Sequence, residues 1–239
     1  MLDTVVVMVS VGPRDHLTDF CFKRLYKWAS RHGYNCMLLK QGYPMLDKAP
    51  HFNKLKVPQM VPGYKRYIIV DDDIMIKENA PAMDSVPSGF VGLCMDAVQT
   101  NTEAPHVEWT ANSGFIVTDG SGAALLDEAY NLGEYPYKHN DGSGKGIWGP
   151  FDQGIVNDVL FKHEKIYKLD WRWNFQPVLD YFMNDRGWEV WSKSRLYRLM
   201  YYIAQIIPVK KTNKKKVKEA YGVHLIRVSN PLFFDFLYK

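Results

Sequence analysis

Three consecutive aspartates at the end of an apolar run constrain the fold of this chain more than any other feature. The run from Tyr67 to Val70 is typical of a buried strand, and Asp71, Asp72 and Asp73 follow it directly. Neighbouring carboxylates repel one another, so they need solvent or a cation. Because strand side chains alternate, we expect Asp71 and Asp73 on one side and Asp72 on the other. Two carboxylates on one side suit Mg²⁺ or Mn²⁺, although a solvated acidic turn also fits an isolated triplet.

The order of the predicted elements before the triplet indicates an α/β fold. A strand over Thr4 to Val11 is followed by a helix over His16 to Arg31, with Asp15 as its cap, and by a strand over Tyr34 to Leu39. A strand, a helix and a strand in this order predict a right-handed parallel crossover. Ligands bind such sheets at the carboxyl ends of the strands, where the loop Ser10 to Asp15 and the triplet both lie.

The rest of the chain continues the alternation of helices and strands. We expect a helix over His51 to Pro62, strands over Gly89 to Met95 and Phe115 to Val117, and helices over Ala123 to Leu132 and Gln153 to Leu160, the last with Asp152 as its N-cap. Of the two lysines at 54 and 56, one is expected to face the crevice as a phosphate ligand, although solvated helix lysines are common.

Composition limits the classes of protein to which the chain belongs. Hydrophobic residues make up 46% of the 239 residues, enough for the core of one domain. The net charge of +4 is too small to predict a nucleic-acid partner. Three cysteines without paired spacing, an N-terminal apolar run without a preceding basic region, and the absence of a long apolar run predict a cytoplasmic protein.

Five motifs, in this order, resemble the GT-A fold of nucleotide-sugar glycosyltransferases, and most closely its glycogenin-like, retaining group. They are Lys54-Leu55, Val70-Asp71-Asp72-Asp73-Ile74, Asn112-Ser113-Gly114, the run from Phe151 to Asn157, and Val223-His224-Leu225. The resemblance implies one Rossmann-like GT-A domain over residues 1–239, with a mostly parallel central sheet flanked by helices. Residues of about 1–120 would bind the nucleotide sugar, and those of about 121–239 the acceptor, with a basic C-terminal segment.

The resemblance also implies a role for each matched position. A divalent ion, Mn²⁺ or Mg²⁺, would be held by Asp71, Asp73 and His224. The positions that would contact the nucleotide sugar are Lys54, Asp71, Asp72, Asn112, Ser113 and Arg227, and those that would act at the transferred sugar are Asp152 and Gln153. Arg227 stands in for a family lysine that is missing here. The run Trp171-Arg172-Trp173-Asn174-Phe175 is similar to an element near the acceptor.

The implied activity is metal-dependent transfer of a sugar from a nucleoside diphosphate sugar, with UDP expected, to an acceptor hydroxyl with retention of configuration. The acceptor can be a glycan, a lipid-linked molecule or a protein. Two alternatives stay open. A sugar-phosphate nucleotidyltransferase would need a glycine-rich basic first loop, whereas Gly12-Pro13-Arg14-Asp15 has one glycine. The second alternative is a carbohydrate- or nucleotide-binding module without catalysis.

A segment outside these motifs, residues 195–218, combines apolar and aromatic residues with a cluster of lysines from Lys210 to Lys218. This composition is typical of a helix that lies at a membrane surface and is attracted to anionic lipid. A core helix followed by a solvated lysine loop fits it as well. Peripheral membrane association through this segment is therefore one of two open interpretations.

Overall fold

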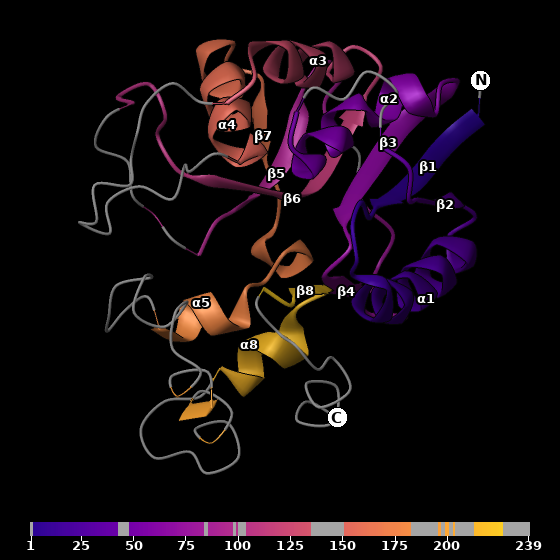
Figure 1. Ribbon diagram of the computed structural model, residues 1–239, viewed down its shortest axis with the longest axis vertical. Coiled ribbons are helices and arrows are strands. Elements are labelled where there is room, and N and C mark those ends of the chain that lie inside the picture. The colour runs from indigo at the N-terminus through magenta and orange to yellow at the C-terminus, as the bar shows by residue number, and fades with distance from the viewer. Residues whose placement is uncertain are drawn as a thin grey trace.

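The computed structural model describes residues 2–42, 48–83, 86–97, 99, 104–134, 151–182, 196, 199–200, 203 and 213–226. Helices cover both faces of a central sheet, and a second, smaller sheet lies beside it (Figure 1). The expected α/β fold with helices around a central sheet is therefore confirmed. Arg227, one of the predicted ligands, lies outside the described residues.

The central sheet has six strands in the order β2-β1-β3-β6-β5-β7. Their bounds are β1 Leu2–Val9, β2 Asn35–Leu39, β3 Tyr64–Asp71, β5 Val91–Met95, β6 Ala111–Asp119 and β7 Ile166–Lys168. Strand β1 pairs in parallel with β2 and β3, and β5 pairs in parallel with β7. Strand β6 runs antiparallel to both β3 and β5. The sheet is thus mixed and mostly parallel.

The strands are apolar on both faces because each face has its own hydrophobic cluster. Val6 and Met8 of β1 belong to the cluster that includes Leu25 and Trp28 of helix α1 (Asp15–Arg31). Val5 and Val7 belong to the cluster on the other side, which α3 (Ala123–Leu132) and α4 (Asp152–Lys162) cover. Side chains on both faces of the strand are therefore buried, which explains the continuous apolar run in the sequence.

The remaining described helices are short, and some boundaries differ from those expected. They are η1 Pro50–Lys56, α2 Val57–Met60, η2 Trp171–Trp173, α5 Pro177–Phe182 and α8 Lys214–Glu219. The helix expected over 51–62 is a 3₁₀ helix followed by one α-helical turn, with Pro58 in the first turn, where no amide donor is needed. The prediction that Asp15 and Asp152 are N-caps was wrong. Each is the first residue of its helix, and the N-caps are Arg14 and Phe151.

The small sheet brings the end of the chain to the acidic triplet. Strand β4 (Ile74–Ile76) pairs antiparallel with β8 (Gly222–His224), and Ile74 lies opposite His224. The amide of Leu225 donates to the carbonyl oxygen of Asp73 at 2.7 Å. Gly222 is required at the start of β8, since a Cβ there would lie 2.2 Å from the carbonyl oxygen of Trp173. Backbone pairing therefore fixes residue 224 beside residue 73.

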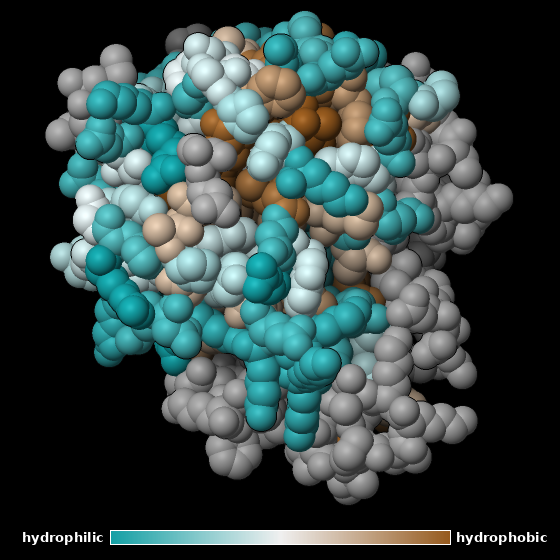
Figure 2. Space-filling view, turned by 180° about the vertical axis from the view of Figure 1, so that it is seen from behind, coloured by the Kyte–Doolittle hydropathy of each residue, from teal (hydrophilic) through white to brown (hydrophobic). Residues whose placement is uncertain are grey.

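Figure 2 shows one face of the molecule, coloured by hydropathy. On the face turned away from the viewer in Figure 1, hydrophilic residues predominate, and apolar residues gather near the middle (Figure 2). Among the described residues, no helix has the length and apolarity that crossing a bilayer requires.

Candidate metal centre and adjoining pocket

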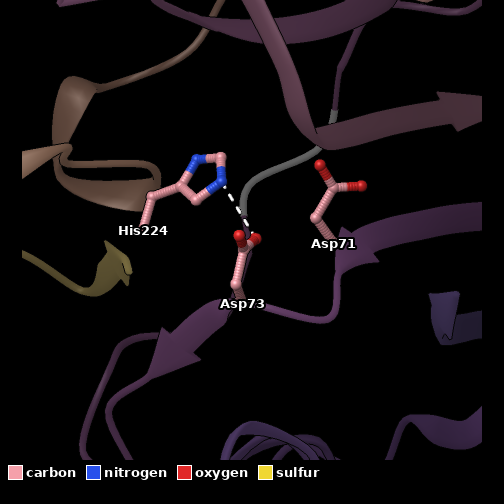
Figure 3. Close-up of side chains that lie close together, drawn as sticks. All are labelled: Asp71, Asp73 and His224. Carbon is pink, nitrogen blue, oxygen red and sulfur yellow. Dashed lines mark ion pairs between the residues drawn. The ribbon is translucent and has the colours of Figure 1, made fainter. Parts of the chain in front are cut away.

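Asp71, Asp73 and His224 converge at the carboxyl end of β3 (Figure 3). Strand β3 ends at Asp71, Asp73 follows in the turn before β4, and His224 is the last residue of β8. One ligand atom from each side chain lies within 4.8 Å of the others. Asp72 lies in the same turn, is not part of this group, and accepts a hydrogen bond from Ser10 of the first loop.

The charges of these groups depend on one another. His224 Nε2 lies 3.0 Å from Asp73 Oδ1. Burial acts to lower the pKa of His224, but the carboxylate of Asp73 outweighs it and raises that pKa. Burial also acts against ionisation of Asp73, yet His224 and Arg14 hold its pKa below the usual range. Burial raises the pKa of Asp71 to about 6, although Lys54 opposes the shift. The triplet is therefore balanced by neighbouring cations.

A chain of hydrogen bonds fixes the ring of His224. The amide of Gly114 donates to Asn112 Oδ1 at 2.9 Å, which assigns that atom as the acceptor. Asn174 Nδ2 donates to the same oxygen at 2.7 Å, so Asn174 Oδ1 is the atom that accepts from His224 Nδ1 at 2.9 Å. The Nε2 atom is left facing Asp73. A neutral His224 held in this way presents the Nε2 lone pair to a metal.

Lys54 is the lysine of η1 that faces the triplet. Its Nζ lies 2.7 Å from Asp71 Oδ1 and 3.3 Å from Asp152 Oδ2, and it donates to the carbonyl oxygen of Ser113 at 3.2 Å. The contact with Asp152 is an ion pair only, since Asp152 Oδ2 accepts no hydrogen bond among the described residues. Lys56 faces the other way and pairs with Asp127. Of the two lysines, Lys54 is therefore the one that faces the crevice, and its role as a phosphate ligand stays a prediction.

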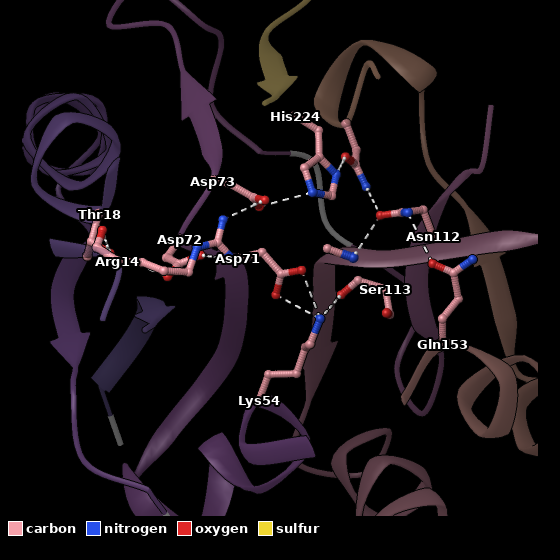
Figure 4. Close-up of polar contacts among 12 residues, drawn as sticks. Arg14, Thr18, Lys54, Asp71, Asp72, Asp73, Asn112, Ser113, Gln153 and His224 are labelled. Carbon is pink, nitrogen blue, oxygen red and sulfur yellow. Dashed lines mark hydrogen bonds and ion pairs between the residues drawn. The ribbon is translucent and has the colours of Figure 1, made fainter. Parts of the chain in front are cut away.

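Asn112 and Gln153 lie side by side (Figure 4). Both donate to Asp96, a residue that the sequence did not single out. Asp96 Oδ2 accepts from Asn112 Nδ2 at 2.9 Å and from Gln153 Nε2 at 2.9 Å. Asn112 Nδ2 also donates to Gln153 Oε1 at 3.1 Å. Asn112 and Ser113 were expected to lead into the strand at Phe115, and both lie within β6 itself. Strand and helix residues thus form one hydrogen-bonded polar group near the candidate metal ligands.

Arg14 of the first loop is a second residue without an assigned role in the sequence. Its Nη2 donates to Asp73 Oδ2 at 2.9 Å, and its Nη1 lies 3.1 Å from Asp72 Oδ1. Asp72 Oδ2 accepts from Ser10 Oγ at 2.7 Å and from Thr18 Oγ1 at 3.3 Å. The first loop and the triplet therefore meet at one edge of the sheet, as expected from the parallel strands.

A pocket of about 280 Å³ opens beside these groups, and it has an apolar part and a charged part. Its lining residues are Val9, Val11, Arg14, Pro50, His51, Lys54, Asp71 and Asp72. Two cationic side chains and an apolar wall suit a ligand that has a flat apolar group and an anionic group.

The donor set fits a divalent metal ion. Two carboxylates and one imidazole, from Asp71, Asp73 and His224, place ligand atoms within 4.8 Å of one another. Carboxylate oxygens are preferred by Mg²⁺ and Mn²⁺, and imidazole is a common ligand of transition metals. The group can therefore hold a divalent ion. Lys54 and Arg14 occupy the remaining carboxylate oxygens nearby.

The sequence matches no protein-family model and no curated protein. The fold, however, is similar to those of several solved glycosyltransferases. One is involved in the glycosylation of the major capsid of PBCV-1, with a TM-score of 0.59, 14% identity and 98% of each chain covered. Another is the galactosyltransferase LgtC in complex with donor and acceptor sugar analogs, with a TM-score of 0.52, 12% identity, and coverage of 98% of this chain and 95% of LgtC.

A third similar structure is the glycosyltransferase GlyE of Streptococcus pneumoniae TIGR4. It has a TM-score of 0.53 and 11% identity, and the match covers all of this chain but only 61% of GlyE. Identities this low carry the fold and not the substrate. The expected resemblance is confirmed at that level, and the chain has the fold of the GT-A glycosyltransferases.

Proposed function

We propose that this protein is a metal-dependent glycosyltransferase. It moves a sugar from a nucleoside diphosphate sugar, with UDP as the nucleotide, to an acceptor hydroxyl with retention of anomeric configuration. One observation carries the proposal: Asp71, Asp73 and His224 converge at the carboxyl end of β3, within a GT-A fold and beside a pocket with cationic walls. This edge of the sheet is where α/β folds bind their ligands.

The chemistry required is stabilisation of the leaving diphosphate. When bound by Asp71, Asp73 and His224, Mn²⁺ or Mg²⁺ supplies a Lewis acid at the phosphates. Lys54 adds a buried cation that remains protonated, because the carboxylates of Asp152 and Asp71 raise its pKa although burial acts to lower it. Negative charge that develops on the diphosphate is thus met by charges already in place. Arg227 remains a proposal for this role, and it lies outside the described residues.

The sugar is expected to lie on the side of Lys54 where Asp152 is found. The carboxylate of Asp152 is buried, and its Oδ2 has no hydrogen bond within the described part of the chain. A hydroxyl of the transferred sugar or of the acceptor can donate to this oxygen. Gln153, Asn112 and Ser113 surround the same position, with the first two fixed by Asp96. These residues orient the sugar, and retention requires no strong protein base.

Calorimetric titration tests the donor site. A panel of nucleoside diphosphates and their sugars is titrated into the protein with and without Mn²⁺, and the same is done with an Asp71→Asn/Asp73→Asn double variant. Metal-dependent binding of one nucleotide that the double variant loses is expected. The exposed carboxylate of Asp3 provides the control, and Asp3→Asn should bind as the wild type does.

Two results would redirect the proposal. If no nucleotide binds, the glycosyltransferase assignment fails. If a nucleotide binds but its sugar is neither hydrolysed nor transferred, the protein is a binding module without catalysis. Proton NMR of the product reads the anomeric configuration, and an inverted product would assign a general base instead.

We also propose that the segment 195–218 binds a membrane surface, where the acceptor would lie. Most of this segment lies outside the described residues. Four apolar residues there are helical and exposed, with a spacing that puts them on one face: Leu196, Leu199, Met200 and Ile203. Helix α8 supplies four lysines, at 214, 215, 216 and 218. Co-sedimentation with anionic vesicles, weakened by salt, is expected. Equal binding to neutral vesicles, or none to either, would remove the membrane as partner.

A further inference from the structure

Arg14 is placed by the first loop directly against the triplet. Gly12 has φ 123°, a conformation that glycine adopts readily, and the amide of Arg14 donates to the carbonyl oxygen of Gly12 at 3.0 Å. The guanidinium bridges Asp72 and Asp73 (Figure 4). Its side chain is 46% exposed, whereas those of Asp72 and Asp73 are 8% and 12% exposed. A ligand can therefore reach Arg14 while the two carboxylates stay buried.

Arg14 and a metal ion need the same carboxylate. Asp73 has its Oδ1 against His224 and its Oδ2 against Arg14, so both oxygens already contact cations. A divalent ion in the Asp71, Asp73 and His224 group has to share Asp73 with the guanidinium or displace it. Even without displacement, two cations on one carboxylate repel each other. Arg14 therefore weakens the binding of a metal that arrives alone.

Release of Arg14 from the triplet leaves no buried carboxylate without a donor. Asp72 keeps its hydrogen bonds from Ser10 and Thr18. Asp73 keeps His224 and gains the metal. A buried carboxylate that loses its last partner would be costly, but neither of these does. The guanidinium can thus turn toward a ligand at small cost in the rest of the site.

The pocket shows which ligand would meet the guanidinium. Arg14 and Lys54 both line it, together with Asp71 and Asp72 of the triplet. A diphosphate group that enters the pocket beside the metal ligands lies between two cations. Guanidinium binds phosphate oxygens through two parallel N–H donors, which a lysine does not provide.

We propose that Arg14 couples metal binding to diphosphate binding at this site. Without nucleotide, Arg14 competes with the metal for Asp73, and with nucleotide it binds the phosphates and leaves Asp73 to the metal. Because linkage is reciprocal, the metal and the diphosphate raise each other's affinity by one common factor, and Arg14 supplies part of that factor. The inference deepens the proposed function, on which it rests, by naming a diphosphate ligand outside the recognised motifs.

The test compares Arg14→Gln with the wild type by calorimetry, using Mn²⁺ alone, UDP with Mn²⁺, and pyrophosphate with Mn²⁺. Loss of the competing charge should raise the affinity for Mn²⁺ alone severalfold. Loss of the guanidinium should lower the affinities for UDP and for pyrophosphate, each measured with Mn²⁺, by about tenfold. The opposite signs are the signature of coupling. Arg31→Gln is the control, because Arg31 ends the same helix, about 25 Å away, and should leave all three affinities unchanged.

Each remaining outcome is decisive. If the wild type binds UDP with Mn²⁺ and Arg14→Gln changes neither affinity, the coupling role is wrong and the proposed function stands. If the wild type binds none of the three probes, both are wrong. Should circular dichroism show that Arg14→Gln is unfolded, Arg14→Lys decides, since it keeps the charge and loses the paired donors. Weaker UDP binding by Arg14→Lys supports the proposal, and unchanged UDP binding overturns it.

Discussion

The position of the His224 ring depends on the absence of a side chain at Gly114. A Cβ at residue 114 would lie 2.8 Å from His224 Cε1 and 2.9 Å from Asn112 Oδ1. Contacts this short require the neighbours to move. The glycine therefore sets the distance between β6 and the imidazole of the candidate metal site.

We expect Gly114→Ala to weaken Mn²⁺ binding by about ten- to a hundredfold, because the displaced ring leaves its hydrogen-bonded position. Calorimetry with Mn²⁺ measures the change. Gly120→Ala is the matched control, since a Cβ at residue 120 has nothing within 4 Å. Equal Mn²⁺ affinities of the two variants would show that the close contact does not position the imidazole.

Substitutions of the two buried lysines of η1 distinguish a role in nucleotide binding from a role in stability. Lys54 pairs with Asp71 and Asp152 at the site, and Lys56 pairs with Asp127 away from it. Lys54→Gln leaves two carboxylates without their cation, so we expect a loss of about 3 kcal/mol in unfolding free energy and a loss of nucleotide binding. Lys56→Gln should destabilise the protein without affecting nucleotide binding. Urea unfolding and calorimetry give the two readouts, and nucleotide binding lost in both variants would contradict the assignment.

Residues of the site were predictable from sequence only where they belong to a motif. The positions Asp71, Asp73 and His224 were expected together and do converge. Arg14 and Asp96 were assigned no role, and Asn174 was expected only in an element near the acceptor, because a single polar residue in a loop has the same local pattern whether it is solvated or buried. Their partners come from distant segments, such as Asn174 with His224, and local periodicity contains no information about such pairs.

At the level of elements, sequence periodicity predicted helix α3 more closely than strand β6. Helix α3 has the expected bounds, Ala123–Leu132. Strand β6 begins at Ala111, several residues before the expected Phe115, because the polar residues Asn112 and Ser113 were expected only to lead into the strand. Asn112 is tolerated inside the sheet since Asp96, Gln153 and Asn174 satisfy its amide. Polar residues that have partners can extend a buried strand.

Asp119 joins the turn after β6 to the residues that precede β5. Its Oδ2 accepts from Ser88 Oγ at 2.5 Å, and its Oδ1 accepts from the amide of Gly122 at 2.8 Å. Burial acts to raise the pKa of Asp119, but these hydrogen bonds outweigh it and lower that pKa. A carboxylate with a lowered pKa stabilises the fold above its ordinary pKa, and this stabilisation is lost as the pH falls through the folded value.

We therefore expect Asp119→Asn to lower the unfolding free energy by about 1 kcal/mol at pH 6, and the difference from wild type to shrink as the pH falls toward 3. Urea unfolding of both proteins across this range measures it. A difference that stays constant with pH would mean that the charge of Asp119 contributes nothing to stability.

On the scale of the whole molecule, the candidate site exists only in the folded chain. It joins the first loop, the end of β3, the beginning of α4 and the last described strand, β8. The division into a nucleotide-binding part up to about residue 120 and an acceptor part after it remains a prediction. The candidate metal ligands span that boundary, since Asp71 and Asp73 lie before it and His224 after it.

Because the site forms only in the folded chain, metal binding should stabilise the folded state. The unfolded chain separates Asp73 from His224 by most of its length, so Mn²⁺ should bind the folded state alone. At a free Mn²⁺ concentration one hundred times the dissociation constant, the folded state gains about 2.7 kcal/mol. For a domain of this size we expect the melting temperature to rise by about 5 to 10 °C. The Asp71→Asn/Asp73→Asn variant should show no rise, whereas Asp3→Asn should behave as the wild type does. An equal rise in the double variant would place the bound ion elsewhere on the molecule.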